Sequence, residues 1–287
     1  MIDYAMKFEL YNDIKKYTED VMHTLIQNEI QNIIIISNCL SGTKGIDTSK
    51  WIMATVKNLD GSPALIALMT PPHNVVLFEP DNIQNDEALD ILVNEFIGYG
   101  IKMPGVFAEK SIAFRFADKY SSLCKTSGGK GRNSRIYKLD KVNDILFSKG
   151  ILRLATQNDM FFLPYWKIAF SLECGLGMID VQNAVDKASR SLSDNNLYVW
   201  EDCFPVSQAS IGKKTSNGVA VSEVYTPPHY RGKGYAASCV ASLSQHLLDS
   251  GNKFCCLFTD LANPTSNSVY KKIGYEPVCD YDEYKFI

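Results

Sequence analysis

The sequence lacks an excess of basic residues, since 29 Lys and Arg face 32 Asp and Glu and the formal net charge is −3. Proteins that bind nucleic acids or anionic membranes usually carry a basic excess, so neither is expected as a partner. No segment reaches about 18 uninterrupted apolar residues, the length that a membrane-crossing helix needs. The N-terminal segment carries charges throughout and has no apolar core typical of a signal peptide. We therefore expect a cytoplasmic protein.

Metal-ligand spacing is also missing from the eight cysteines. Adjacent Cys255 and Cys256 stand in a hydrophobic run and are expected in the core. Free thiols fit a reducing cytoplasm, and we expect no bound metal. With 287 residues and 46% hydrophobic composition, the chain is long enough for one large or two ordinary globular domains.

The segment that carries the clearest chemistry is Tyr225 to Ala236, YTPPHYRGKGYA. Here a predicted strand ends, turns through two prolines and leads through a glycine-spaced basic loop into an amphipathic helix. Gly232 and Gly234 can take positive φ and approach a ligand closely, and the first amides of the helix have no partners within it. Those amides, the helix dipole and the charges of Arg231 and Lys233 favour an anion such as a pyrophosphate.

The second half of the chain is predicted to alternate helices and strands around this loop. Thr265 or Ser266 is expected to cap the last helix, and Gly274 to end it. The order predicts an α/β fold with a mixed, mostly antiparallel sheet flanked by helices. Helices are expected at about 158–174, 179–192, 234–250 and 265–272, and strands at 197–202, 206–212, 218–226 and 253–258, with a final extended segment to 287.

The first half repeats part of this order. Residues 50–59 and 63–71 are predicted to form a hairpin that turns at Asp60 and Gly61. The second arm ends in Thr-Pro-Pro-His at 70–73, and the same four letters recur at 226–229. After each copy come a helical run, a short extended run and a second helix, so two related units are expected. The first copy continues HNVVLFEPDN where the second continues HYRGKGYA, so the first half lacks the anion loop.

Two features separate the halves. One is a glycine-rich segment, KTSGGKG at 125–131, which is predicted to be a loop, and the other is the turn at 148–150. We place the boundary near Gly150, which gives domains 1–149 and 150–287.

The anion loop resembles the acyl-CoA-binding motif of the GCN5-related N-acetyltransferases (GNAT). In that motif Gln or Arg is followed by two residues, Gly, one residue, and Gly or Ala, and the matching positions here are Arg231, Gly234 and Ala236. The downstream run FTDLANPTSNSVYKKIGYEPV resembles the next motif of the same family. The resemblance covers roughly 152–287. It implies the GNAT acyl-CoA N-acyltransferase fold for the second half and a degenerate copy of it in the first, a tandem arrangement.

Two other phosphate-binding loops fit the sequence less well. A Walker-type loop needs a wider glycine spacing and a Lys followed by Ser or Thr, whereas Lys233 is followed by Gly234. A dinucleotide fold needs a third glycine where the chain has Ala236, and no acidic residue follows at the required distance.

The resemblance implies acetyl-CoA as co-substrate and no metal. The strand backbone before the loop would pair with the pantetheine arm, and the loop amides would hold the pyrophosphate. Asn263 resembles the family's side chain that hydrogen-bonds the pantetheine. The implied donor site comprises Val224, Tyr225, Thr226, Arg231, Gly232, Lys233, Gly234, Tyr235, Ala236, Asn263 and Ser266.

Two residues are candidates for proton transfer. Tyr270 stands where many family members place a phenol near the CoA sulfur, suited to protonating the departing thiolate. The attacking amine must be neutral, and a lysine-like amine has a pKa of about 10.4, so a base is needed. Glu223 on the strand before the loop is the best placed, and Glu201 and Asp202 on an earlier strand are weaker rivals. Strand alternation puts Glu223 and Tyr225 on one face.

The leading hypothesis is an N-acetyltransferase that moves an acetyl group from acetyl-CoA to a small-molecule primary amine by direct attack in a ternary complex. Trp166 and Tyr165 are candidates for shaping the acceptor pocket. The alternative is a catalytically weak CoA-binding sensor or interaction protein, which needs neither Tyr270 nor a base. A longer acyl donor, an alcohol acceptor and a homodimer stay open. The degenerate first half predicts one CoA per chain.

Overall fold

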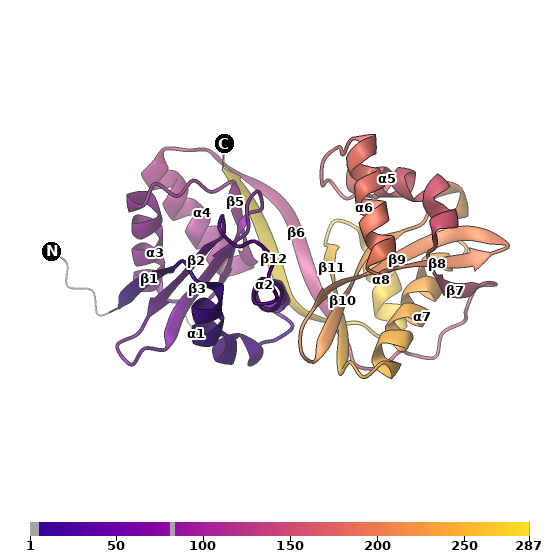
Figure 1. Ribbon diagram of the computed structural model, residues 1–287, viewed down its shortest axis with the longest axis horizontal. Helices are drawn as coiled ribbons and strands as arrows, with labels where there is room; N and C mark the ends of the chain where they lie inside the picture. Colours follow the sequence, from indigo (N-terminus) through magenta and orange to yellow (C-terminus); the bar gives the residue numbers. More distant parts are fainter. Residues whose placement is uncertain (1–5, 81–83, 287) are drawn as a thin grey trace. The chain divides into compact units, whose positions relative to one another are not determined.

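The computed structural model describes residues 6–80 and 84–286, and the chain divides into two compact units (Figure 1). Residues 1–136 and 279–287 form the first unit, and residues 137–278 form the second. These boundaries differ from the domain boundary expected near Gly150. Residues 137–149 belong to the second unit, and residues 279–287 belong to the first.

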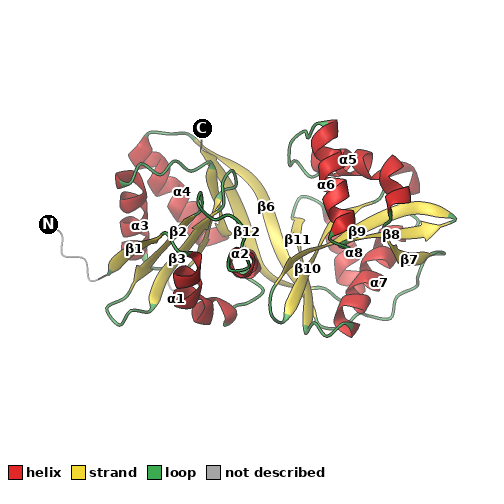
Figure 2. Ribbon diagram, in the orientation of Figure 1, coloured by secondary structure: helices red, strands yellow, loops and turns green. Residues whose placement is uncertain are grey.

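The first unit opens with a strand and two helices. Three consecutive strands follow, and helices and strands then alternate (Figure 2). Its elements are β1 (Lys7–Tyr11), α1 (Ile14–Ile26), α2 (Ile33–Gly42), β2 (Ile52–Lys57), β3 (Pro63–Met69), β4 (Val75–Phe78), α3 (Asp86–Gly98), β5 (Gly105–Glu109), α4 (Lys110–Cys124), most of β6 (Gly128–Leu139) and most of β12 (Glu276–Phe286).

In the second unit, two α-helices precede three consecutive strands. Two further α-helices follow these strands, with one strand between them. Its elements are β7 (Ile151–Leu154), a 3-10 helix (Gln157–Phe161), α5 (Leu163–Glu173), α6 (Val181–Ser193), β8 (Leu197–Asp202), β9 (Phe204–Lys214), β10 (Gly218–Tyr225), a 3-10 turn (Pro228–Tyr230), α7 (Tyr235–Asp249), β11 (Phe254–Asp260) and α8 (Pro264–Ile273).

The sheet of the first unit has the strand order β1-β2-β3-β4-β5-β12-β6. Both of its faces are covered, which explains why β3 is apolar at nearly every position. Alternation along this strand sends Leu65 and Ala67 into a core with α3 and α4, whereas Ile66 and Leu68 pack in a second core with α1 and α2. The hairpin predicted to turn at Asp60 and Gly61 is present as β2 and β3.

In the second unit the strand order is β11-β10-β9-β8-β7, with the end of β6 beside β11. Helices α7 and α8 pack on one face, where Val221, Leu243 and Ile273 share a core. Helices α5 and α6 lie on the other face (Figure 1), where Leu163 and Val199 are buried together. Strands β10 and β11 are parallel and the β7-β8, β8-β9 and β9-β10 pairs antiparallel, which confirms the expected mixed sheet.

The predicted elements of the second half match this unit with small differences. The helix expected from 158 begins as a 3-10 turn, and the α-helix starts at Leu163. The cap of α8 is neither Thr265 nor Ser266 but Asn263, whose Oδ1 accepts a hydrogen bond from Ser266 N at 3.0 Å. Gly274 ends this helix at φ 115° as predicted. Of the final extended segment, Ile287 lies outside the described residues.

The repeated Thr-Pro-Pro-His letters occupy different places in the two units. In each unit one strand pairs in parallel with the strand that follows a helix: β4 with β5, and β10 with β11. The letters at 70–73 precede β4, whereas those at 226–229 follow β10. The four-letter match is therefore not an aligned repeat. The repeated order itself is present, because strand, helix, parallel strand and helix follow one another in both units.

The glycine-rich segment at 125–131 is not the predicted loop, because β6 already begins at Gly128. A Cβ on Gly131 would lie 2.6 Å from a carboxylate oxygen of Glu283, so a larger residue here would require that side chain to shift.

Candidate functional site

Strands β10 and β11 form a short parallel pair and then separate. The register joins Gly218 to Phe254 and Ala220 to Cys256, and this pairing ends at Ala220 although β10 continues to Tyr225 and β11 to Asp260. The edge of β10 that faces β11 is thereby left open beyond Ala220. An extended ligand arm can hydrogen-bond to such an edge as an added strand would. Val224, Tyr225 and Thr226, predicted to contact the donor, lie at this end of β10.

A β-bulge interrupts β10 at the same level. The register with β9 joins Ser222 to Ser210 and Tyr225 to Gln208, so an interval of two residues on β9 faces three on β10. Glu223 occupies the bulge with φ of 49°, a left-handed conformation that is uncommon for a residue other than glycine. Gln208 Nε2 donates to Glu223 O at 3.3 Å. Such local backbone strain is concentrated at functional positions in proteins.

The start of α7 is open to a ligand. Gly232 and Gly234 have φ of 76° and 80°, as predicted, and Gly234 precedes the first helical residue. No side chain among the described residues caps this helix. By contrast, α3 of the first unit is capped by Asn85, whose Oδ1 accepts from Ala88 N at 2.9 Å. The uncapped amides of α7 can therefore receive an anion.

Arg231 makes contacts inside the protein that its predicted role did not include. Its guanidinium donates to both carboxylate oxygens of Glu173 at the end of α5, at 2.9 and 2.6 Å, and its Nε donates to Thr226 O at 2.8 Å. The amide of Arg231 donates to Pro228 O at 3.2 Å. A phosphate would have to compete with Glu173 for this side chain, so the open amides of the loop begin after Arg231.

The other predicted loop residues differ in how they are engaged. Lys233 is exposed and its Nζ lies 5.9 Å above the ring of Tyr230. The phenol of Tyr235 donates to Asp202 Oδ2 at 2.7 Å. Ala236, in the first turn of α7, is half-buried. Lys233 can swing toward an anion, whereas Tyr235 anchors the helix start to β8.

Asn263 and Ser266 lie at the start of α8, after β11. Because Asn263 uses its Oδ1 as the helix cap, only its Nδ2 can serve a ligand. The amide that Asn263 accepts from is that of Ser266, so both predicted contacts belong to one capping turn.

Tyr270 lies on the inner face of α8 and is buried. Burial raises the pKa of its phenol well above the ordinary value of 10.0, and the nearby Cys174 raises it further. The phenol therefore stays protonated throughout the neutral range, as a general acid must. Its ring contacts Tyr275 edge to face, with centroids 6.0 Å apart.

The three candidate bases have different surroundings. Glu201 is paired with Arg153 at the outer side of the sheet, and Asp202 accepts from Tyr235. Glu223 lies beside the open edge of β10 and contacts α5, where its Oε2 is 2.6 Å from Lys167 Nζ. Tyr225 contacts the same helix through Trp166, with ring centroids 5.9 Å apart. Both strand residues thus face α5, as alternation predicts.

Sequence reasoning missed the residues that hold the candidate base and the loop arginine. These are Lys167, Glu173 and Ser210, which come from α5 and β9 and from no motif. The one sign of Lys167 in the sequence was a lysine within a largely apolar helix. Trp166, predicted to line an acceptor pocket, packs on Phe162 with centroids 4.4 Å apart, whereas the side chain of neighbouring Tyr165 is exposed.

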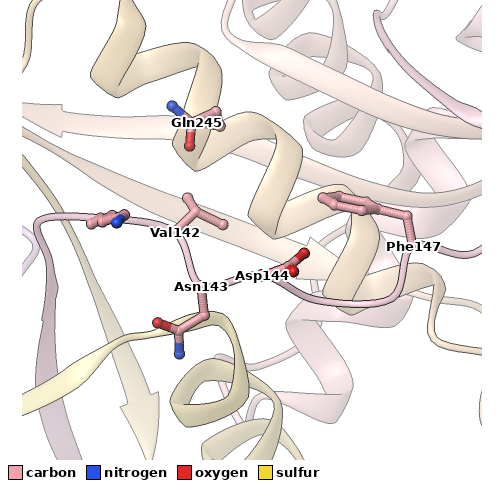
Figure 3. A pocket seen from close by; sticks show the side chains of 6 residues that line it. Val142, Asn143, Asp144, Phe147 and Gln245 are labelled. Atoms are coloured by element: carbon pink, nitrogen blue, oxygen red, sulfur yellow. The ribbon is translucent and has the colours of Figure 1, made fainter.

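The second unit also has a surface hollow of about 470 Å³ (Figure 3). Val142, Asn143, Asp144 and Phe147 line it from the loop that follows β6, and Gln245 lines it from α7. None of the predicted site residues borders this hollow. The separation of β10 and β11, and not this hollow, is therefore the candidate site.

Three further observations concern disulfides, metal ligands and membrane-spanning helices. None of the eight cysteines, all of which lie within the described residues, forms a disulfide, and Cys255 and Cys256 are buried as predicted. Within 6–80 and 84–286, no group of three or more His, Cys, Asp or Glu is arranged to hold a metal ion. In the same ranges, every helix is too short or too polar to span a bilayer.

Comparison with known proteins gives one matching family model, described as FR47-like protein, at residues 211–285. No match to a curated protein sequence is found. Among solved structures, the chain is similar to a GCN5-related N-acetyltransferase from Sphaerobacter thermophilus, with 12% identity, a TM-score of 0.66 and coverage of 97% of this chain and 95% of that one. A protein from Drosophila has 11% identity, a TM-score of 0.65 and coverage of 99% and 98%. A tandem GNAT protein from the clavulanic acid biosynthesis pathway has 8% identity, a TM-score of 0.59 and coverage of 97% of both chains.

At these identities the structural likeness shows the fold. It covers 97% of this chain in both GNAT structures, so the expected tandem GNAT fold is confirmed. The matched family model spans the loop at Arg231 and the segment around Tyr270. The resemblance predicted from these two motifs is thereby confirmed for the second unit.

Proposed function

We propose that the second unit is an acetyl-CoA-dependent N-acetyltransferase that acetylates a primary amine of a small molecule in the cytoplasm. The observation that carries the proposal is the separation of β10 from β11 after Ala220, directly before an uncapped helix start at Gly234. An open strand edge suits the amide-bearing pantetheine arm, and an open helix start suits the pyrophosphate. The two places are consecutive along the chain, as they are along coenzyme A.

The residues present fit this donor. Amides from Gly232 to Ala236 would hold the pyrophosphate, with Lys233 as the mobile counter-charge. The backbone of Val224 would pair with the arm, and Asn263 Nδ2 would donate to it. Backbone amides of β10 beside the bulge would polarise the thioester carbonyl as its oxygen gains charge.

In direct transfer the acetyl group passes from sulfur to nitrogen in one ternary complex. The neutral amine attacks the thioester carbon, a C–N bond forms, and the C–S bond breaks. The amine proton passes to Glu223, and Tyr270 gives its proton to the departing thiolate. Proton exchange with solvent then restores both side chains before the next turnover. Since both acid and base lie in the second unit, one donor site and one acceptor site per chain suffice.

A thiol-release assay with a panel of small amines tests the proposal. Acetyl-CoA should yield free CoA thiol faster with at least one amine than without, and the acetylated amine should appear in equal amount by mass spectrometry. A CoA-binding sensor would bind acetyl-CoA in calorimetry yet release no thiol with any amine. That result would contradict the enzyme hypothesis and support the sensor hypothesis.

Tyr270→Phe is expected to lower kcat about tenfold to a hundredfold and leave the affinity for acetyl-CoA nearly unchanged, because only the proton to the thiolate is lost. Since burial raises the pKa of this phenol well above 10.0, deprotonation of Tyr270 should not reduce the wild-type rate up to about pH 9. The loss in the variant should therefore be constant from pH 6 to about pH 9. A steady-state pH series checks this, and an unchanged kcat would remove Tyr270 from the acid role.

A further inference from the structure

Lys167 is a buried lysine that no motif explains. Its side chain is only 3% exposed, and its Nζ lies 2.6 Å from Glu223 Oε2 and donates to Ser191 Oγ at 3.0 Å. The ammonium thus joins α5 to α6 and to the bulge of β10. Lysine is rarely buried to this degree unless it is paired, so the charge at this place calls for an explanation.

The carboxylate of Glu223 is held at one oxygen. Oε2 accepts from Lys167 and also from Ser210 Oγ at 2.9 Å. For Oε1, no donor is found among the residues that the structure describes, and the side chain is 33% exposed. One oxygen is therefore fixed by the protein, and the other is left for a molecule that enters from solvent.

A fixed ammonium at this position has two physical consequences. It removes the rotational freedom of the carboxylate, so that Oε1 keeps one direction, and proton transfer is sensitive to such placement. It also places a positive charge close to the entering amine, and a nearby like charge disfavours the protonated form of that amine. Both effects favour a neutral amine whose N–H points at Oε1.

We propose that Lys167 is the positioning residue for Glu223, with Ser210 as its helper, so that Oε2 is reserved for the protein and Oε1 takes the proton of the amine. This proposal rests on the proposed function of Glu223 as base. The bonds that form and break are those of the acetyl transfer, and Lys167 takes no part in them.

The test compares Lys167→Met, which keeps the length without the charge, with Lys167→Arg, which keeps the charge. We expect the methionine variant to lose about tenfold to a hundredfold in kcat while the KM for acetyl-CoA stays within about twofold. The arginine variant should recover much of that kcat. Should the methionine variant fail to fold, Lys167→Gln takes its place, because glutamine still donates a hydrogen bond without charge.

A double variant separates this proposal from the function on which it rests. If Lys167 acts through Glu223, Lys167→Met should cost little further kcat in a Glu223→Gln background. Additive losses, or equal losses in the methionine and arginine variants together with a raised KM for acetyl-CoA, would show a merely structural role. An unchanged kcat in Lys167→Met, with Glu223→Gln impaired, would overturn the positioning role alone. An unchanged kcat in Glu223→Gln would overturn the base assignment itself.

Discussion

Replacing Ala236 by glutamate is expected to raise the dissociation constant of acetyl-CoA at least about a hundredfold while the chain stays folded. Ala236 is half-buried in the first turn of α7, where the amides are uncapped. A carboxylate there occupies the place of the pyrophosphate and repels it, and a like charge at contact distance costs roughly 4 kcal/mol near a protein surface. The same carboxylate favours the helix start, so the thermal midpoint should not fall.

The matched control is Ala236→Gln, which has the same size without the charge. Calorimetric titration should give it an affinity much nearer to wild type than that of the glutamate variant. If the glutamate and glutamine variants bind acetyl-CoA equally well, the start of α7 is not where the donor's phosphates lie.

Glu223→Gln is expected to lower kcat about a hundredfold to a thousandfold, because the amide cannot accept the proton that the carboxylate takes from the amine. Binding of acetyl-CoA should change little, since the loop and α7 are untouched. Steady-state kinetics with the best amine of the panel, together with calorimetry for the donor, separates the two effects.

Glu201→Gln serves as the control for this loss. Its carboxylate is paired with Arg153 and does not contact Glu223's partner on α5. We expect its kcat to stay within about threefold of wild type. A larger loss in Glu201→Gln than in Glu223→Gln would move the base to β8.

The donor side of the site was predictable because its determinants are local. Positive φ at Gly232 and Gly234, a helix directly after them, and a strand directly before them can all be read from consecutive residues. The two motifs also placed the candidate site in the second unit. Even here the sequence misplaced one detail, because Asn263, and neither Thr265 nor Ser266, caps α8.

The contacts that hold the charged side chains Glu223 and Arg231 were only partly predictable because they join distant segments. Lys167 reaches Glu223 across 56 positions, and Glu173 reaches Arg231 across 58. Neither pair follows a spacing rule, because α5 is brought to β10 by packing and not by a motif. The bulge at Glu223 was equally hidden, since no glycine or proline marks it.

The predicted equivalence of the two Thr-Pro-Pro-His turns was wrong, also because it depended on tertiary structure. Four identical letters suggested equivalent turns. The parallel pairing of β4 with β5 shows that the turn at 70–73 comes before the strand of the parallel pair, whereas the turn at 226–229 comes after the corresponding strand β10. Pairing direction is a tertiary property, so a short match between two segments cannot reveal it.

Hydrogen exchange of the backbone amides, with and without acetyl-CoA, tests the central claim most directly. The claim is that the donor lies along the open edge of β10 and at the start of α7. Acetyl-CoA should slow exchange in peptides that cover 221–236, and not in those that cover the β4 to α3 connection of the first unit. Protection at that connection, or none at 221–236 under saturating acetyl-CoA, would contradict the account.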